Sequence, residues 1–117
     1  MAATAAQSEL IGRLRHLLAA EPSTREVPMF GGRSFMVNDK LVVSALKSGG
    51  LLVRVPAEHH DELLGRPGAA QAEMGAGRTM GPGWVEVTPD AVGTDQGLSE
   101  WLAVALDHNR ATTRAQR

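Results

Sequence analysis

The sequence predicts an α+β fold: a two-layer α/β sandwich in which one antiparallel sheet carries helices on one face. Three observations support this prediction: an apolar stripe at helical spacing near the start, short apolar runs separated by turn residues in the middle, and a clearer helical stripe near the end. The expected order is α-β-β-β-α-β-β-α. A chain of 117 residues can bury one core but not two, so residues 1–117 are expected to form a single domain.

The first helix is expected over residues 4–20, because its apolar residues recur on one side of the helical wheel. These residues are Leu10, Ile11, Leu14, Leu17 and Leu18. Pro22 lacks a backbone donor and restricts the residue before it, so the helix should end near Ala20.

A corner motif joins this helix to the strands, and it consists of Met29, Phe30, Gly31 and Gly32. The two bulky apolar side chains are expected to be buried. The glycines permit backbone angles and close approaches that a Cβ would prevent. We therefore expect the chain to turn here from helix to sheet.

Three short strands follow on tight turns and predict an antiparallel meander. They are expected over residues 33–37, 41–46 and 51–55. Asn38 and Asp39 tolerate the left-handed backbone of a hairpin turn between the first two strands.

The next part of the chain predicts a short helix and two further strands. Pro56 suits the first turn of a helix over residues 57–64. An edge strand is expected over residues 70–74 and the last strand over residues 83–88. Between them, the glycine-rich residues 75–83 predict a loop or an irregular hairpin connection.

The last helix has the clearest apolar stripe, and Thr94 or Asp95 is its expected cap. The stripe consists of Leu98, Trp101, Leu102, Ala105 and Leu106. The polar residues 109–117 are expected to fray.

The last strand predicts an interface. Alternation places Val85 and Val87 on one face and Trp84 and Glu86 on the other. If helices cover only one face, the opposite face is uncovered, and a large aromatic side chain there is typical of a protein contact. Trp84 and Glu86 are therefore the candidate interface residues, and a homodimer is expected.

Composition excludes several classes of function. Twelve basic and thirteen acidic residues give a net charge of −1, so the charge does not indicate nucleic-acid binding, although a local patch stays open. The absence of cysteine excludes disulfides and thiolate chemistry. No leader and no apolar run of about 20 residues is found, so a cytoplasmic protein without membrane contact is expected.

Catalytic, metal and cofactor sites are not predicted. His59 and His60 are adjacent, so on a helix they diverge and are expected on a solvated face. The glycine spacing in residues 75–81 differs from that of a dinucleotide loop, and a strand follows it where that loop needs a helix. We therefore expect no enzyme and no cofactor, with an uncharacterised enzyme as the alternative.

Three arginines form a second hypothesis. Arg54 interrupts an apolar strand, Arg33 follows the glycine pair, and Arg78 lies in the glycine-rich segment. If the three converge at one end of the sheet, they form a patch that binds anions or nucleic acid. The alternative is three separate surface arginines whose stems pack on the sheet.

Five ordered blocks of residues resemble the N-terminal domain of the TfoX/Sxy competence-regulator family. The blocks are residues 29–32, 35–41, 52–55 and 77–87, followed by Leu98, Trp101 and Ala105. The resemblance implies a secretion-chaperone-like α+β fold and a role in competence or transcription regulation. It also implies a stand-alone domain without the helical C-terminal domain of the full-length regulators. The leading hypothesis is thus a non-enzymatic domain that acts by protein–protein contact.

Overall fold

The computed structural model describes residues 5–21, 23–29, 32–75 and 78–115. In these ranges the α-helices are α1 (Ala5–Leu17), α2 (His60–Leu64) and α3 (Asp95–Ala115), and the 3-10 helix η1 (Ala57–His59) leads into α2. The strands are β1 (Arg25–Met29), β2 (Gly32–Val37), β3 (Lys40–Ala45), β4 (Leu51–Arg54), β5 (Ala69–Gln71), β6 (Glu73–Gly75), β7 (Arg78–Thr79) and β8 (Trp84–Val87).

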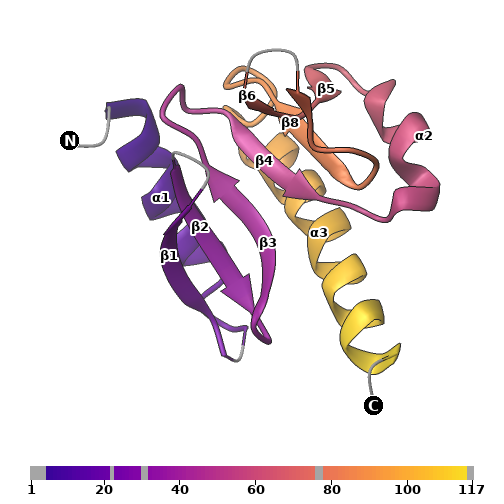
Figure 1. The fold of residues 1–117 in the computed structure, drawn as a ribbon. Coiled ribbons are helices and arrows are strands. Elements are labelled where there is room, and N and C mark those ends of the chain that lie inside the picture. Colours follow the sequence, from indigo (N-terminus) through magenta and orange to yellow (C-terminus); the bar gives the residue numbers. More distant parts are fainter. Residues whose placement is uncertain (1–4, 22, 30–31, 76–77, 116–117) are drawn as a thin grey trace.

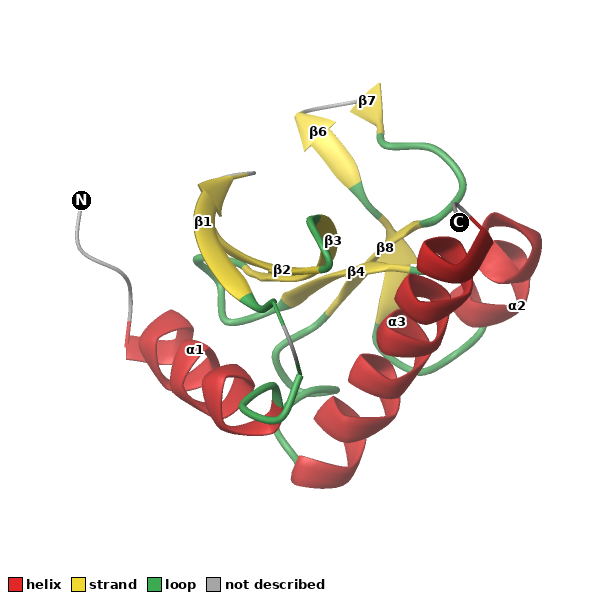
Figure 2. Cartoon of the chain, turned by 90° about the horizontal axis from the view of Figure 1, so that it is seen from below, coloured by secondary structure: helices red, strands yellow, loops and turns green. Residues whose placement is uncertain are grey.

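Six of these strands form one antiparallel sheet in the order β1-β2-β3-β4-β8-β5, while β6 and β7 form a separate ribbon (Figure 1). The sheet is curved, and the described helices lie on one of its faces (Figure 2). The opposite face is called the helix-free face below. This architecture confirms the predicted α+β fold class.

The corner motif is only partly described. Met29 ends β1 and pairs with Gly32 at the start of β2, whereas Phe30 and Gly31 lie outside the described residues. The sequence did not predict β1, because Pro28 interrupts it and its residues show no clear apolar pattern. A proline is tolerated at this position because β1 lies at the edge of the sheet.

The edge strand predicted over residues 70–74 is divided in the structure: β5 lies in the sheet, whereas β6 pairs with β7 in a separate ribbon. The ribbon extends into residues 75–83, where the sequence predicted a loop or an irregular hairpin. Its pairing is irregular, with a register shift between Glu73 and Gly75. The Asn38–Asp39 turn is confirmed, since both residues have positive φ angles, 54° and 63°.

The core lies between the sheet and the helices. Alternate strand residues such as Phe35, Val53 and Val85 contact the apolar stripes of α1 and α3, and all three are at most 1% exposed. No helix in the described ranges is both long and apolar enough to cross a membrane.

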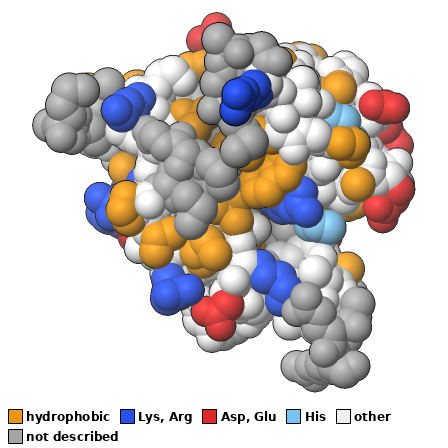
Figure 3. Space-filling model, viewed as in Figure 1, with side chains coloured by type: hydrophobic (Ala, Val, Ile, Leu, Met, Phe, Trp, Pro, Cys, Tyr) orange, Lys and Arg blue, Asp and Glu red, His pale blue; other side chains and the backbone are white. Residues whose placement is uncertain are grey.

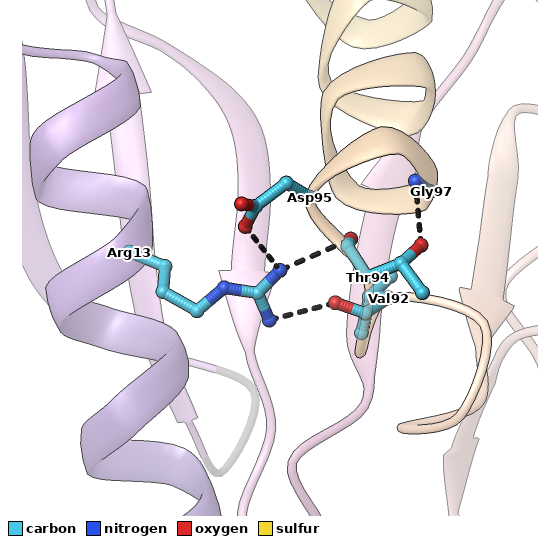
Figure 4. Close-up of polar contacts among 5 residues, drawn as sticks. All are labelled: Arg13, Val92, Thr94, Asp95 and Gly97. Atoms are coloured by element: carbon cyan, nitrogen blue, oxygen red, sulfur yellow. Dashed lines mark hydrogen bonds and ion pairs between the residues drawn. The ribbon is translucent and has the colours of Figure 1, made fainter.

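An arginine ties α1 to the start of α3 (Figure 4). Arg13 donates from Nη1 to the Val92 carbonyl oxygen at 2.7 Å and from Nη2 to the Thr94 carbonyl oxygen at 3.1 Å. Its Nη2 also lies 3.5 Å from the Asp95 carboxylate. Thr94 caps α3, because its Oγ1 accepts the Gly97 N–H at 3.0 Å. The predicted cap is thereby confirmed at Thr94.

Replacing Arg13 with alanine should lower the free energy of unfolding by about 1–2 kcal/mol, because it removes two charge-assisted bonds to backbone carbonyls. Urea denaturation followed by circular dichroism measures this loss. Arg15→Ala is the matched control two residues along the same helix. Arg15 makes a bidentate ion pair with Glu26, at 2.7 and 2.8 Å, but the Arg15 side chain is 58% exposed, so a smaller loss is expected. Equal losses in the two variants would contradict the proposed role of Arg13.

The end of α3 differs from the expected frayed tail. The described helix continues to Ala115, and Asn109 is 3% exposed. Its Nδ2 donates to the Val37 carbonyl oxygen at 2.9 Å, and its Oδ1 accepts from Asn38 Nδ2 at 3.4 Å. The polar residue at position 109 therefore anchors the helix to the β2–β3 turn.

Candidate functional site

A cavity opens where β3 separates from β4. The two strands pair only from Val43–Val53 to Ala45–Leu51, so Lys40 at the start of β3 has no partner on β4. Figure 1 shows β3 bending away from β4 toward this end, with α3 visible between them. The cavity has a volume of about 340 Å³ and is called the β3–β4 notch. It is lined by Lys40, Leu41, Arg54, Trp84, His108, Asn109 and Thr112.

Arg54 is held in the notch by its cross-strand partner, Trp84. The guanidinium carbon lies 4.6 Å from the centroid of the indole ring, which is a cation–π contact. Nη1 also donates to the Gly83 carbonyl oxygen at 3.3 Å. Burial lowers the pKa of Arg54, but a guanidinium stays charged at any physiological pH.

Glycine is required at position 83. Its φ angle is 98°, and a Cβ there would meet Arg54 Nη1 at 2.5 Å. The glycine before Trp84 therefore makes room for the arginine.

Lys40 and His108 bring the other basic groups to the notch. Lys40 Nζ donates to Thr113 Oγ1 on α3 at 3.4 Å. The pKa of His108 is lowered, first by burial and then by the positive charge of Arg54, while Glu58 acts in the opposite direction. None of the described residues that line the notch is acidic. The arrangement is suited to an anion.

The residues at the centre of the helix-free face are buried. Ser34 and Ser44 pair across β2 and β3, Leu52 continues the same row on β4, and the three are between 0% and 3% exposed. Their position follows from alternation with core residues such as Phe35. The sequence predicted an uncovered face, but the structure buries the middle of it. Figure 3 shows hydrophobic side chains gathered over the strands on this face.

A family model of the TfoX N-terminal domain matches residues 16–109. The chain belongs to the TfoX N-terminal domain family. This confirms the resemblance carried by the five sequence blocks. A search of the curated proteins and a search of the solved structures gave no match.

In this TfoX N-terminal domain the three candidate arginines do not meet. Arg33 shares the strand parity of Phe35, which faces the helices, whereas Arg54 shares that of Leu52 on the helix-free face. Arg78 is exposed on β7 and does not line the notch. The structure joins Arg54 to Lys40 and His108 instead of Arg33 and Arg78.

Trp84 and Glu86 both lie on the helix-free face, as alternation with the core residues Val85 and Val87 requires. Trp84 is half-buried beneath the guanidinium of Arg54, and Glu86 is exposed. Their role as an interface stays a prediction.

His60 is the residue whose role the sequence did not indicate. It is 4% exposed, although the sequence predicted a solvated helix face. Its Nδ1 accepts the Gly83 N–H at 3.0 Å, so Nε2 carries the proton and donates to Gln71 Oε1 at 2.7 Å. The sequence feature that could have indicated the burial of His60 is its i, i+3 spacing to Leu63, which is also buried. His60 thus fixes the backbone next to Trp84.

The described residues do not form a metal-binding site. In the part of the chain that the structure describes, no group of three or more His, Cys, Asp or Glu residues is placed to hold a metal ion.

Proposed function

We propose that this TfoX N-terminal domain is a non-enzymatic regulatory domain, of the competence or transcription-control type, that acts by protein–protein contact. The observation that supports the proposal most directly is the large aromatic side chain of Trp84, which is only half-buried on the helix-free face. Hydrophobic side chains also gather over the strands on this face (Figure 3). Trp84 and Glu86 lie on the same face and form part of the proposed interface. The family match supports a regulatory role.

The proposed partner is a second copy of the chain, because this face carries charges of both signs. Glu86 on β8 is exposed, and Arg25 lies on the edge strand β1 with a side chain 59% exposed, although it pairs with Asp39 at 3.2 Å. A two-fold axis places the same patch of both copies in contact. Glu86 of one copy can then lie near Arg25 of the other.

Glu86→Arg should weaken self-association by about tenfold or more, because it places like charges across the interface. Sedimentation equilibrium over a range of protein concentrations measures this change. Glu100→Arg is the matched control, since Glu100 is exposed on α3, on the opposite side of the sheet. A wild-type chain that stays monomeric at every concentration would refute the second copy as partner.

The regulatory role needs a cellular readout. Deleting the gene should change transcript levels of the genes it controls, and the wild-type and Glu100→Arg proteins should restore them. Glu86→Arg should restore them poorly if contact through the helix-free face carries the function. Transcript levels that do not respond to deletion would contradict a regulatory role.

A further inference from the structure

We propose that the β3–β4 notch binds the phosphate group of a small phosphate monoester, with Arg54 and Lys40 as its principal contacts. This goes beyond protein–protein contact, because it gives the domain a small-molecule ligand. The notch lies between β3, β4 and α3, and Glu86 does not line it.

The charge of the notch is the first reason. In the described residues, no ion pair joins Arg54 or Lys40 to a carboxylate. Other arginines of the chain do have such partners; they are Arg13, Arg15, Arg25 and Arg110. Two cations in one half-enclosed space without an acid attract an anion, because the low dielectric constant strengthens the interaction.

The orientation of Arg54 is the second reason. The indole of Trp84 holds the flat face of the guanidinium, and the Gly83 carbonyl oxygen accepts one N–H. A guanidinium has five N–H donors that lie in one plane, so the others can serve an acceptor at its edge. A phosphate accepts two parallel N–H bonds from an arginine held in this way. Because the side chain is already positioned, binding costs less conformational entropy.

The volume of the notch and the charge of its two cations favour a phosphate monoester as the ligand. A cavity of about 340 Å³ is near the lower end of the range for small-molecule sites. A phosphate monoester carries a charge of about −1.5 to −2 at pH 7, which two cations balance. A single carboxylate would leave one of them without a counter-charge.

His108 should make the affinity depend on pH. Burial and Arg54 lower its pKa in the empty notch, and a bound dianion would raise it again. A phosphate itself gains a proton in this range, because its second pKa is about 6, so the effect of His108 is isolated with sulfate, which stays a dianion. Sulfate binding should strengthen as the pH falls toward 6, because protonation of His108 adds a third positive charge. The charged groups around His108 are Arg54 and Lys40 in the notch, and Glu58, His59, Glu62, Arg66 and Asp107 on its other side.

The test is calorimetric titration of the full chain with O-phosphoserine and with inorganic phosphate at low ionic strength. Both probes should bind saturably at neutral pH, and sulfate, which stays a dianion over this range, should bind more tightly at pH 6 than at pH 8. Arg54→Gln and Lys40→Gln should each weaken binding by about tenfold or more, because each removes a charge-assisted contact. Arg78→Gln makes the same charge change outside the notch and should bind as the wild type does.

Two further variants keep the result interpretable. If the Arg54→Gln protein does not fold, the Lys40→Gln protein still tests the proposal. Among the described residues, Lys40 Nζ is hydrogen-bonded only to Thr113, so the substitution should leave the fold intact. Glu86→Arg should retain phosphate affinity even where self-association is lost, which separates this proposal from the proposed function. The proposal is overturned if neither probe binds at millimolar concentration or if Lys40→Gln binds like the wild type. Tighter binding of a short DNA duplex than of phosphoserine would overturn it in favour of nucleic acid.

Discussion

Replacing Gly32 with valine should lower the free energy of unfolding by about 3 kcal/mol or more, near the upper end for overpacking. A Cβ at this position would collide with the carbonyl group of Ala45 on β3, and its second neighbour is Ser44 Oγ at 3.2 Å. A carbonyl held in the sheet cannot move aside as a flexible side chain can. The sequence predicted this requirement from the glycine pair, and the structure attributes it to proximity, since Gly32 does not have a positive φ.

Urea denaturation measures the loss, and another glycine supplies the control. Gly12 lies in α1, and a Cβ there would meet nothing within 4 Å. Gly12→Ala should therefore raise stability by about 0.5–1 kcal/mol, the difference in helix propensity between the two residues. A Gly32→Val protein as stable as the wild type would show that β2 and β3 are not packed as described.

Phe35→Ala should cost about 3–5 kcal/mol, the range found when a buried aromatic side chain is truncated. Phe35 is 1% exposed and is among the largest fully buried side chains of the described chain. It lies on the side of β2 that contacts the helices, so its loss leaves a cavity between the two layers. Thermal and urea unfolding of the variant both report the change.

Met36→Ala is the matched comparison, because the next residue points to the opposite face of the strand. Met36 is only half-buried, so its truncation should cost less than half as much. Similar losses for the two variants would contradict the assignment of strand faces on which the helix-free face depends.

Local chemistry made most of the fold predictable. The Asn38–Asp39 turn needs left-handed backbone at two consecutive positions, and few residue pairs tolerate it. A threonine before an apolar stripe indicates a helix start, and Thr94 caps α3 as expected. By contrast, β1 contains Pro28 and owes its place to pairing with β2, which a local pattern does not reveal.

The candidate site was less predictable, because its parts are brought together by tertiary structure. Arg54 could be singled out as a charge within an apolar strand. Its companions Lys40 and His108 are distant in sequence, and they meet it because β3 leaves β4 and α3 continues past that point. Arg33 could have been separated from Arg54 by strand parity alone, since Arg33 lies on the same face of its strand as Phe35.

Buried polar residues were missed for a related reason. His60 and Asn109 belong to residue types that are usually found at the surface. Their burial is explained by their hydrogen-bond partners. These partners are backbone groups on other elements, the Gly83 N–H and the Val37 carbonyl oxygen. A sequence pattern carries no information about such groups.

The strand order also bears on how the chain is made. The segment Trp84–Val87 pairs on one side with Leu51–Arg54 and on the other with Ala69–Gln71, so the last strand to leave the ribosome fills a position inside the sheet. Until it arrives, both flanking strands expose backbone donors and acceptors that invite pairing with another chain. Nascent chains of this domain thus need protection from such pairing until Trp84–Val87 has left the ribosome.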